Sequence, residues 1–329
     1  MSHDHLHALP PATFAAMGTL IFAALMPATA SAQAWPTKAV RVIVPFAPGG
    51  GSDITARQVS TKLTDIFKQQ FIVDNRAGAG GIVGMEMAAR APADGYTILM
   101  ASGSFSASAA THKPAFDPIN SLPGVAEFGL TPFVLTVHPS IPAKTTKELI
   151  ALAKSKPGDL TFATSGVGGL THMATELILS MTGTRMVGVH YKSTGAAMTD
   201  LLAGQAPIIV GSLLPIVPHV GTGKLRALAV TTEKRWYALP NVPTVGDTLP
   251  GYAVELWFGA MAPRNTPQPI VDALNGAINK ILTEPEMKKN LDSQGMLATG
   301  GTPAKFNQRI RAEYERWTKI VTERGIKVQ

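Results

Sequence analysis

Three consecutive glycines, Gly49 to Gly51, follow an apolar run and stand directly before Ser52 and Asp53. Glycine has no Cβ, so the backbone can turn tightly there and lie close to a ligand. Ser52 or Asp53 can cap a helix that starts at this point, and the first N–H groups of such a helix have no partner within it. These N–H groups and the positive end of the helix dipole favour a carboxylate or a phosphate. The spacing therefore predicts an anion site.

Small or polar loops follow other apolar runs, at residues 76–84, 101–106 and 164–171. A single glycine loop is explained equally well by a tight strand-to-helix connection. In open α/β sheets, however, ligands bind outside the carboxyl ends of the strands, so loops 46–53, 76–84 and 101–106 are expected on one face. Phe46 lies between Pro45 and the glycine turn, where it cannot pack under the strand and is a candidate wall of a pocket.

Individual side chains near these loops have two interpretations each. Asp53 could bind an ammonium or hydroxyl group, although helix capping also explains it. His172 could contact a ligand, but a lone histidine at a helix start is more often a hydrogen-bonded structural residue. Asp200 could bind a ligand or pair with local backbone, and Tyr191 and Lys192 could close over an acid, although Lys192 is equally explained as a solvated charge.

The motifs of several enzyme classes are missing. No loop carries a P-loop ending or a dinucleotide fingerprint, no serine lies in a G-x-S-x-G elbow, and no histidine pair has zinc-site spacing. We therefore expect no catalytic residues, no metal, no cofactor and no enzymatic activity. The chain has no cysteine, which excludes disulfides and thiolate chemistry.

Composition indicates a folded, anion-compatible protein. The chain has 329 residues, 45% of them hydrophobic and 16% charged, which is enough to bury a sizeable core in two domains or lobes. Its net charge of +7 is spread along the sequence without a cluster of basic and aromatic residues. This pattern argues against nucleic-acid binding and favours attraction of small anions.

Residues 1–34 are expected to be a signal peptide. They contain no Lys or Arg, an apolar run at residues 14–26 too short to span a bilayer, and a possible cleavage site at Ala32-Gln33-Ala34. Histidines at positions 3, 5 and 7 replace the usual basic residues. No later segment is long and apolar enough to span a membrane, so we expect a periplasmic protein.

Short apolar strands alternate with helices from residue 35 onward, which predicts a mainly parallel α/β sheet. The chain is expected to cross into a second lobe near residues 133–137 and to return at residues 256–261. The predicted domains are residues 35–131 with 256–329 for lobe 1 and residues 132–255 for lobe 2. Two crossovers predict a clamshell resembling periplasmic binding proteins, with a hinge near residues 130–133 and 254–259.

Five segments carry a family resemblance: PFAPGGGSD (45–53), VDNRAGAGG (73–81), DGYTILM (94–100), TDLLAGQ (199–205) and LPNVPTVGDTLPGY (239–252). They occur in this order over nearly the whole chain after residue 34. Together they resemble the Bug family, the extracytoplasmic solute receptors of tripartite tricarboxylate transporters. The resemblance implies a clamshell that holds a small carboxylate through backbone amides, hydroxyls and ordered water. It also implies a membrane permease made of one large and one small subunit as partner, and we expect a monomer.

Positions that match the family's binding loops are Phe46, Gly49, Gly50, Ser52, Asp53, Gly80, Gly81, Ser102, Ser165, Gly166, Gly168, His172, Tyr191, Lys192, Gly195 and Asp200. The chain departs from the family pattern at Ala77, where Pro is usual, and at Gly169, where Ser is common. It also departs at Ser193-Thr194 and Ala206-Pro207. The resemblance therefore implies a grip on one carboxylate and leaves the far end of the ligand undefined.

Two other functions fit the same residues. A ligand sensor for a membrane signalling protein, such as a sensor kinase, would use the same clamshell, and neighbouring genes would separate the two. A secreted hydrolase is disfavoured by the missing nucleophile elbow and metal spacing. The predicted function is capture of an organic acid, an aromatic acid or an acidic amino acid without covalent chemistry.

Overall fold

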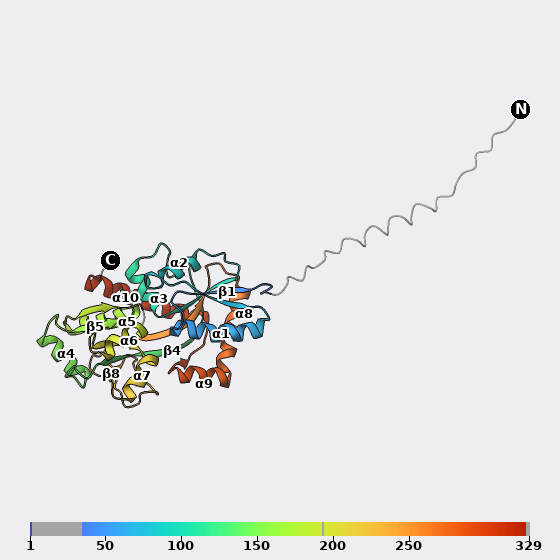
Figure 1. The fold of residues 1–329 in the computed structure, drawn as a ribbon. Coiled ribbons are helices and arrows are strands. Elements are labelled where there is room, and N and C mark those ends of the chain that lie inside the picture. Colours follow the sequence, from blue (N-terminus) through green and yellow to red (C-terminus); the bar gives the residue numbers. More distant parts are fainter. Residues whose placement is uncertain (2–34, 193, 327–329) are drawn as a thin grey trace. The chain divides into compact units, whose positions relative to one another are not determined.

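The computed structural model describes Met1 and residues 35–192 and 194–326, and the chain from Lys38 onward belongs to one compact unit. The strands of this unit form one ten-stranded mixed sheet flanked by helices (Figure 1). The predicted signal segment lies outside the described residues apart from Met1. Within the described part of the chain, no helix combines the length and the apolarity needed to cross a bilayer.

Parallel strands form what we call the first half of the sheet, in the order β2-β1-β3. Val42, Ile43 and Val44 of β1 are at most 1% exposed, as expected for a strand covered on both faces. The elements of the first half are β1 (Val40–Val44), α1 (Gly51–Phe67), β2 (Phe71–Asn75), the 3₁₀ turn η1 (Ala79–Gly81), α2 (Ile82–Ala89), β3 (Thr97–Ser102) and α3 (Ser104–His112).

Two strands run through the middle of the sheet, β4 (Gly124–Val137) and β9 (Glu255–Met261). Residues 124–132 of β4 pair antiparallel with β9, and residues 133–137 pair antiparallel with strands beyond it. Both segments predicted to cross are strands of the sheet, and the crossing between lobes itself stays a prediction. The centre of the sheet is antiparallel where mainly parallel pairing was expected, because the chain leaves and returns in opposite directions.

The strands beyond β4 form the second half. There β5 pairs in parallel with β6 and β7, and β7 and β8 pair with β4. Its elements are α4 (Thr146–Ser155), β5 (Thr161–Thr164), α5 (Leu170–Thr182), β6 (Val187–His190), α6 (Thr194–Leu202), β7 (Ile208–Ser212), α7 (Leu213–Gly221) and β8 (Arg226–Val230). A strand, a glycine loop and a helix thus follow one another in both halves.

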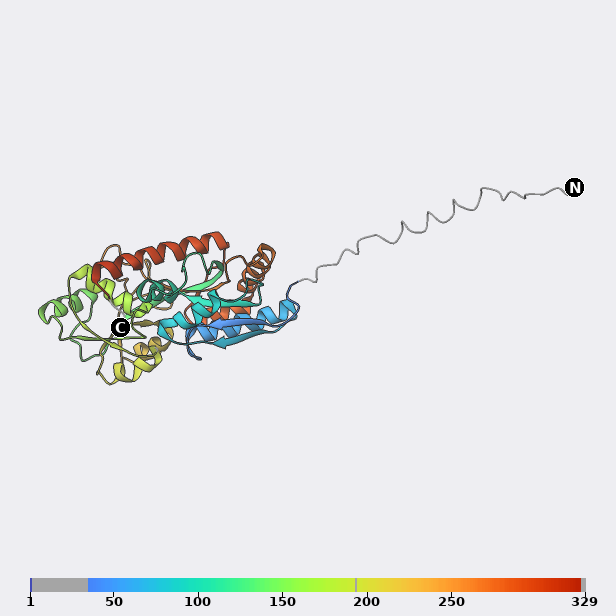
Figure 2. The same cartoon turned by 90° about the horizontal axis from the view of Figure 1, so that it is seen from above.

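The chain ends with α8 (Gln268–Thr283), α9 (Pro285–Ser293), the short β10 (Leu297–Ala298) and α10 (Pro303–Arg324). Helix α10 packs along α3 and reaches α5 in the second half (Figure 2). The ring of Phe306 lies over Gly124 and Gly259, where an added Cβ would come within 2.5 Å of it. Glycine at both positions lets α10 lie close to the crossing strands.

Two helices were missed in the sequence. Residues 101–106 were expected to be a polar loop, but α3 begins at Ser104 because its Ser- and Ala-rich run packs between β3 and α10. Helix α7 was also not predicted, since it contains Pro218.

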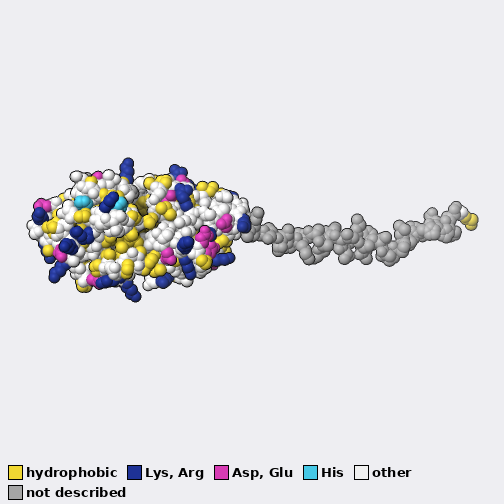
Figure 3. All heavy atoms as spheres, turned by 60° about the horizontal axis from the view of Figure 1, so that its bottom comes forward, with side chains coloured by type: hydrophobic (Ala, Val, Ile, Leu, Met, Phe, Trp, Pro, Cys, Tyr) yellow, Lys and Arg dark blue, Asp and Glu magenta, His cyan; other side chains and the backbone are white. Residues whose placement is uncertain are grey.

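The lobe boundaries at residues 131/132 and 255/256 stay a prediction. On the face drawn in Figure 3, Lys and Arg side chains are scattered among acidic and hydrophobic ones.

Candidate functional site

The first loop joins β1 to α1. Gly49 has a φ of +83°, in the left-handed region that favours glycine, and Gly50 is an extended N-cap with φ −82° and ψ 167°. No side chain caps α1, so the N–H groups of its first turn, at Gly51 and Ser52, have no helical partner. Among the described residues, no atom lies within 4 Å of a Cβ built on Gly49. The loop therefore presents N–H groups with space in front of Gly49.

Asp53 anchors this loop from within the helix. Its carboxylate accepts hydrogen bonds from the Gly49 N–H at 3.0 Å, the Asn75 amide at 2.9 Å and the Arg57 guanidinium at 3.0 Å. Burial alone would raise the pKa of Asp53, but the hydrogen bonds from Arg57, Gly49 and Asn75 outweigh it and lower this pKa. Because its oxygens are engaged, Asp53 shapes the loop from inside the helix. The predicted capping by Ser52 or Asp53 is wrong, because the N-cap is Gly50 and no side chain caps α1.

The second loop lies against the first. Gly80 and Gly81 both have positive φ values, +64° and +102°. The Phe46 ring comes within 3.3 Å of a Cβ built on Gly81, and the Asn75 amide donates to the Phe46 carbonyl at 3.0 Å. The structure therefore brings these two loops together through Phe46 and Asn75.

The third strand end also reaches this place. Ser102, the last residue of β3, is 2% exposed and pairs with Phe258 of β9. The ring of Phe258 lies 3.2 Å from a Cβ built on Gly51. Ser102 thus pairs with the residue whose ring contacts the first loop, which supports the expectation that the three strand ends share a face.

The loop of the second half joins β5 to α5 and is held by neutral groups. The Gly168 N–H donates to His172 Nδ1 at 3.0 Å, and the Ser165 N–H donates to the Thr171 hydroxyl at 2.9 Å. Gly166 and Gly168 have φ values of +136° and +71°. Gly169 is an extended N-cap with φ −71° and ψ 168°, and no side chain caps α5. This helix start repeats the geometry of α1.

His172 is a neutral anchor. Its side chain lies under the loop, and burial, with a smaller contribution from His190, lowers the pKa of His172 to about 4. Glu176 Oε1 lies 3.7 Å from His172 Nε2, but a neutral ring forms no ion pair with it. His172 therefore positions the Gly168 N–H, as the structural interpretation of this residue expected.

The remaining predicted residues follow β6. The Tyr191 hydroxyl donates to Asp200 at 2.6 Å, and burial together with this bond raises the pKa of Tyr191 to about 12. The Tyr191 N–H donates to the Thr164 carbonyl at 2.9 Å, which places this segment beside the loop of the second half. Lys192 and Gly195 are exposed, and Lys192 forms no ion pair with the described residues. The structure does not bring Lys192 and Gly195 to the glycine loops.

The last turn of α3 joins the loops of the two halves and was not predicted. A Cβ on Gly80 would lie 3.1 Å from the His112 ring and 3.2 Å from the Ser108 hydroxyl. A Cβ on Gly168 would lie 3.0 Å from the same ring, and the Thr111 hydroxyl donates to the Gly168 carbonyl at 3.2 Å. The signal in the sequence is the run SFSASAATH, whose small side chains permit close packing.

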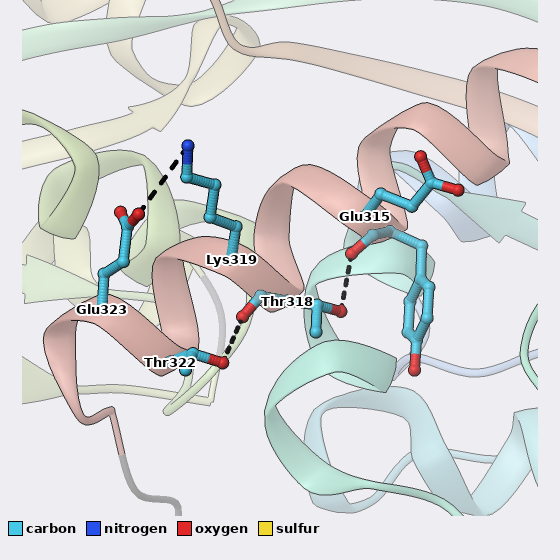
Figure 4. Close-up of a pocket in the computed structure, with 6 residues that line it drawn as sticks. Glu315, Thr318, Lys319, Thr322 and Glu323 are labelled. Carbon is cyan, nitrogen blue, oxygen red and sulfur yellow. Dashed lines mark hydrogen bonds and ion pairs between the residues drawn. The ribbon is translucent and has the colours of Figure 1, made fainter.

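A surface hollow lies away from these loops. It has a volume of about 490 Å³ and is open along α10, lined by Tyr314, Glu315, Thr318, Lys319, Thr322 and Glu323 (Figure 4). All of these residues belong to one helix, and Lys319 pairs with Glu323 at 3.7 Å. This hollow lacks the converging N–H groups of the glycine loops. No group of three or more His, Asp or Glu side chains among the described residues is placed to hold a metal ion.

Comparisons with known proteins identify relatives along most of the chain. A family model described as "Tripartite tricarboxylate transporter family receptor" matches residues 55–326. Protein BugT of Bordetella pertussis is 34% identical over 319 residues, which cover 96% of this chain and 98% of BugT. The predicted resemblance to the Bug family is therefore confirmed.

Solved structures support the same family. The R. palustris protein Rpa4515 with adipate is 33% identical, with a TM-score of 0.81 over 89% of this chain and 99% of its own. MatC (Rpa3494) from Rhodopseudomonas palustris with bound malate is 29% identical, with a TM-score of 0.80 over 87% of this chain and 99% of its own. Further similar structures are periplasmic binding proteins, which confirms the predicted fold class. The relatives are solute receptors and not enzymes.

Proposed function

We propose, since this chain belongs to the tripartite tricarboxylate transporter receptor family, that it captures a small carboxylate between its two halves. The observation that carries the proposal is the pair of uncapped helix starts at Gly50 and Gly169. One lies in each half, with nearly the same backbone angles and no capping side chain. Helix N-termini with free N–H groups bind anions.

The chemistry suits a carboxylate held by dipoles. Asp53 is already paired with Arg57, and His172 is neutral, so neither loop brings an unpaired charge to the ligand. Hydrogen bonds to a charged group contribute about 1.5–3 kcal/mol each. A carboxylate that replaces water in front of these N–H groups is stabilised by the fixed dipoles of the two loops.

We assign the residues of the site two roles. Ligand contact is proposed for Phe46, Gly49, Gly50, Ser52, Gly80, Gly81, Ser102, Ser165, Gly166, Gly168, Tyr191, Lys192 and Gly195. Asp53, His172 and Asp200 are proposed to hold the loops in place, because their polar atoms bond to loop residues.

The biological setting is part of the proposal. Residues 1–34 direct export, and the receptor acts outside the cytoplasm with a permease of one large and one small membrane subunit. Lobe 1 consists of residues 35–131 and 256–329, and lobe 2 of residues 132–255. The two lobes move toward each other around a hinge at residues 130–133 and 254–259. The family description and the continuity of β4 through both halves support this arrangement.

A thermal-shift screen tests the proposal. The panel contains adipate and malate, the ligands of two similar structures, together with monocarboxylates, tricarboxylates and acidic amino acids. A ligand at 100 times its Kd adds about 2.7 kcal/mol, which raises the melting temperature by a few degrees. The amide of each positive acid is the control, and no shift with any carboxylate would contradict the proposal.

Gly50→Val sharpens the test. An added Cβ at Gly50 meets only the Ala47 carbonyl, at 3.8 Å, and the extended φ of −82° suits valine. We expect a slightly lower melting temperature without ligand, because valine is a poorer N-cap than glycine, and a ligand affinity reduced by at least about tenfold, because the side chain occupies the space in front of the N–H groups. Gly276→Ala, on an exposed turn of α8, is the matched control and should bind normally.

A further inference from the structure

The hydroxyl of Thr111 forms a direct contact between the two halves. Thr111 belongs to the last turn of α3, and its Oγ1 donates to the Gly168 carbonyl at 3.2 Å. Thr111 is 8% exposed. A Cβ on Gly168 would collide with this oxygen, so glycine is what permits the contact.

The same hydroxyl has other acceptors within its own helix. Its oxygen lies 3.0 Å from the carbonyls of Ala107 and Ser108. A threonine hydroxyl has one proton to donate. Thr111 can therefore donate either to Ala107, as an ordinary helical threonine does, or across to Gly168. If the halves separate, the Thr111 hydroxyl still has the Ala107 carbonyl as its acceptor, so it is not left without a hydrogen bond.

The neighbouring His112 fixes the position of this oxygen. His112 Nδ1 lies 2.9 Å from Thr111 Oγ1 and 3.1 Å from the Ser108 carbonyl. Its ring also lies between Gly80 of the first half and Gly168 of the second. When His112 Nδ1 carries a proton, it donates a hydrogen bond to Thr111 Oγ1. The hydroxyl proton of Thr111 is then left to donate to the carbonyl of Ala107 or Gly168.

We propose that Thr111 is a positioning residue for ligand capture, whose hydroxyl proton moves from the Ala107 carbonyl to the Gly168 carbonyl when the halves close. The inference rests on the proposed closure around a carboxylate. The Gly168 carbonyl receives this hydrogen bond only when the halves are together, so the contact favours the closed arrangement by about one neutral hydrogen bond, which is small enough for closure to stay reversible. It acts on the loop that carries Gly169, and so orients the start of α5 toward the first half.

Thr111→Val tests the contact, because valine has nearly the same shape and lacks the hydroxyl. Thr175→Val is the matched control: Thr175 is a buried helical threonine whose hydroxyl bonds to the Thr171 carbonyl within α5 only. Loss of one neutral hydrogen bond corresponds to about a fivefold change in an equilibrium. We expect adipate or malate to dissociate about fivefold faster from Thr111→Val, with Thr175→Val within twofold of wild type.

A distance measurement reports closure without ligand. The chain has no cysteine, so Asp65→Cys on α1 and Lys154→Cys on α4 place two unique spin labels on exposed sites of different halves. We expect the Thr111→Val background to shift the distance distribution toward longer values, while Thr175→Val leaves it unchanged. A fold defect alone would lower the melting temperature of both variants and leave the distances unchanged.

Gly168→Ala provides an independent check. It is paired with Gly183→Ala, because Gly183 has a similar φ of +64° but no atom within 4 Å of an added Cβ. Both substitutions carry the same backbone strain, and only Gly168→Ala should lengthen the distance between the labels. Equal distances in the two glycine variants, or in the two threonine variants, would overturn the proposal. If no carboxylate of the thermal-shift panel binds wild type, carboxylate capture is contradicted, while the ligand-free distances still decide the role of Thr111.

Discussion

The loop before α1 and the loop before α5 make the same turn with different anchors. Both end in an extended glycine N-cap, with φ and ψ of −82° and 167° at Gly50 and −71° and 168° at Gly169. The first is held by the charged carboxylate of Asp53, and the second by the neutral ring of His172. The backbone geometry is thus repeated, while the side chain that holds it is not.

The difference shows what an uncapped helix start requires. In each loop the anchor accepts a glycine N–H four residues earlier in the chain, Gly49 for Asp53 and Gly168 for His172. Either an anion or a neutral nitrogen can accept that bond. The charge of Asp53 is balanced by Arg57 at 3.0 Å, so both loops present mainly N–H dipoles.

Removal of the charged anchor should have the largest effect. Asp53→Ala leaves Asn75 and the Gly49 N–H without their acceptor, and bonds to a charged group are worth about 1.5–3 kcal/mol each. We expect the free energy of unfolding to fall by about 3 kcal/mol, measured by urea denaturation. Asp65→Ala, exposed on the same helix, should change it by less than about 0.5 kcal/mol. Similar losses in both variants would mean that Asp53 is no anchor.

Acid should weaken the second loop first. The unfolded chain binds a proton at His172 near pH 6.5, and the folded protein only near pH 4. The neutral ring therefore stabilises the fold fully above pH 6.5, and this contribution is lost as the pH falls toward 4. For Asp53, whose folded pKa lies below 3.8, the corresponding loss begins only below that pH.

His172→Asn separates these two effects, because asparagine keeps an acceptor for the Gly168 N–H and does not titrate. Between pH 7 and pH 5, wild type should lose about 2 kcal/mol more free energy of unfolding than the variant. The measurement is urea denaturation at several pH values. Parallel pH profiles would contradict a neutral buried His172.

The ion pair of the first loop should matter least. The Arg57 side chain is 54% exposed, and exposed pairs contribute below about 1 kcal/mol. Arg57→Gln should therefore lower the free energy of unfolding by less than about 1 kcal/mol, with a smaller difference in high salt. A loss as large as that of Asp53→Ala would show that Arg57, and not the carboxylate, holds the loop.

The glycine loops could be predicted because their residue types determine the backbone directly. Glycines after a buried strand, as at 49–51, leave few alternatives to a tight turn into a helix. The roles of Asp53 and His172 were open in the sequence, because each side chain fits both a ligand and a local backbone group. In the structure their side chains accept hydrogen bonds from the Gly49 and Gly168 N–H groups, which supports the structural role.

The last turn of α3 could not be predicted for a different reason. Ser108, Thr111 and His112 carry no motif, and their importance comes from packing against glycines far away in the sequence. Small residues are compatible with both a loop and a helix, so tertiary contacts with α10 decide the outcome. Local sequence patterns do not predict such long-range contacts.

Phe306 rests on bare main chain at Gly124 and Gly259, and the helix that carries it also packs along α3. A methyl group at either glycine would have no small neighbour to displace, so the whole of α10 would have to lift. The displacement would then reach α3, which packs along α10 and carries Thr111 in its last turn. Two glycines far from the loops would thereby affect the proposed contact at Thr111.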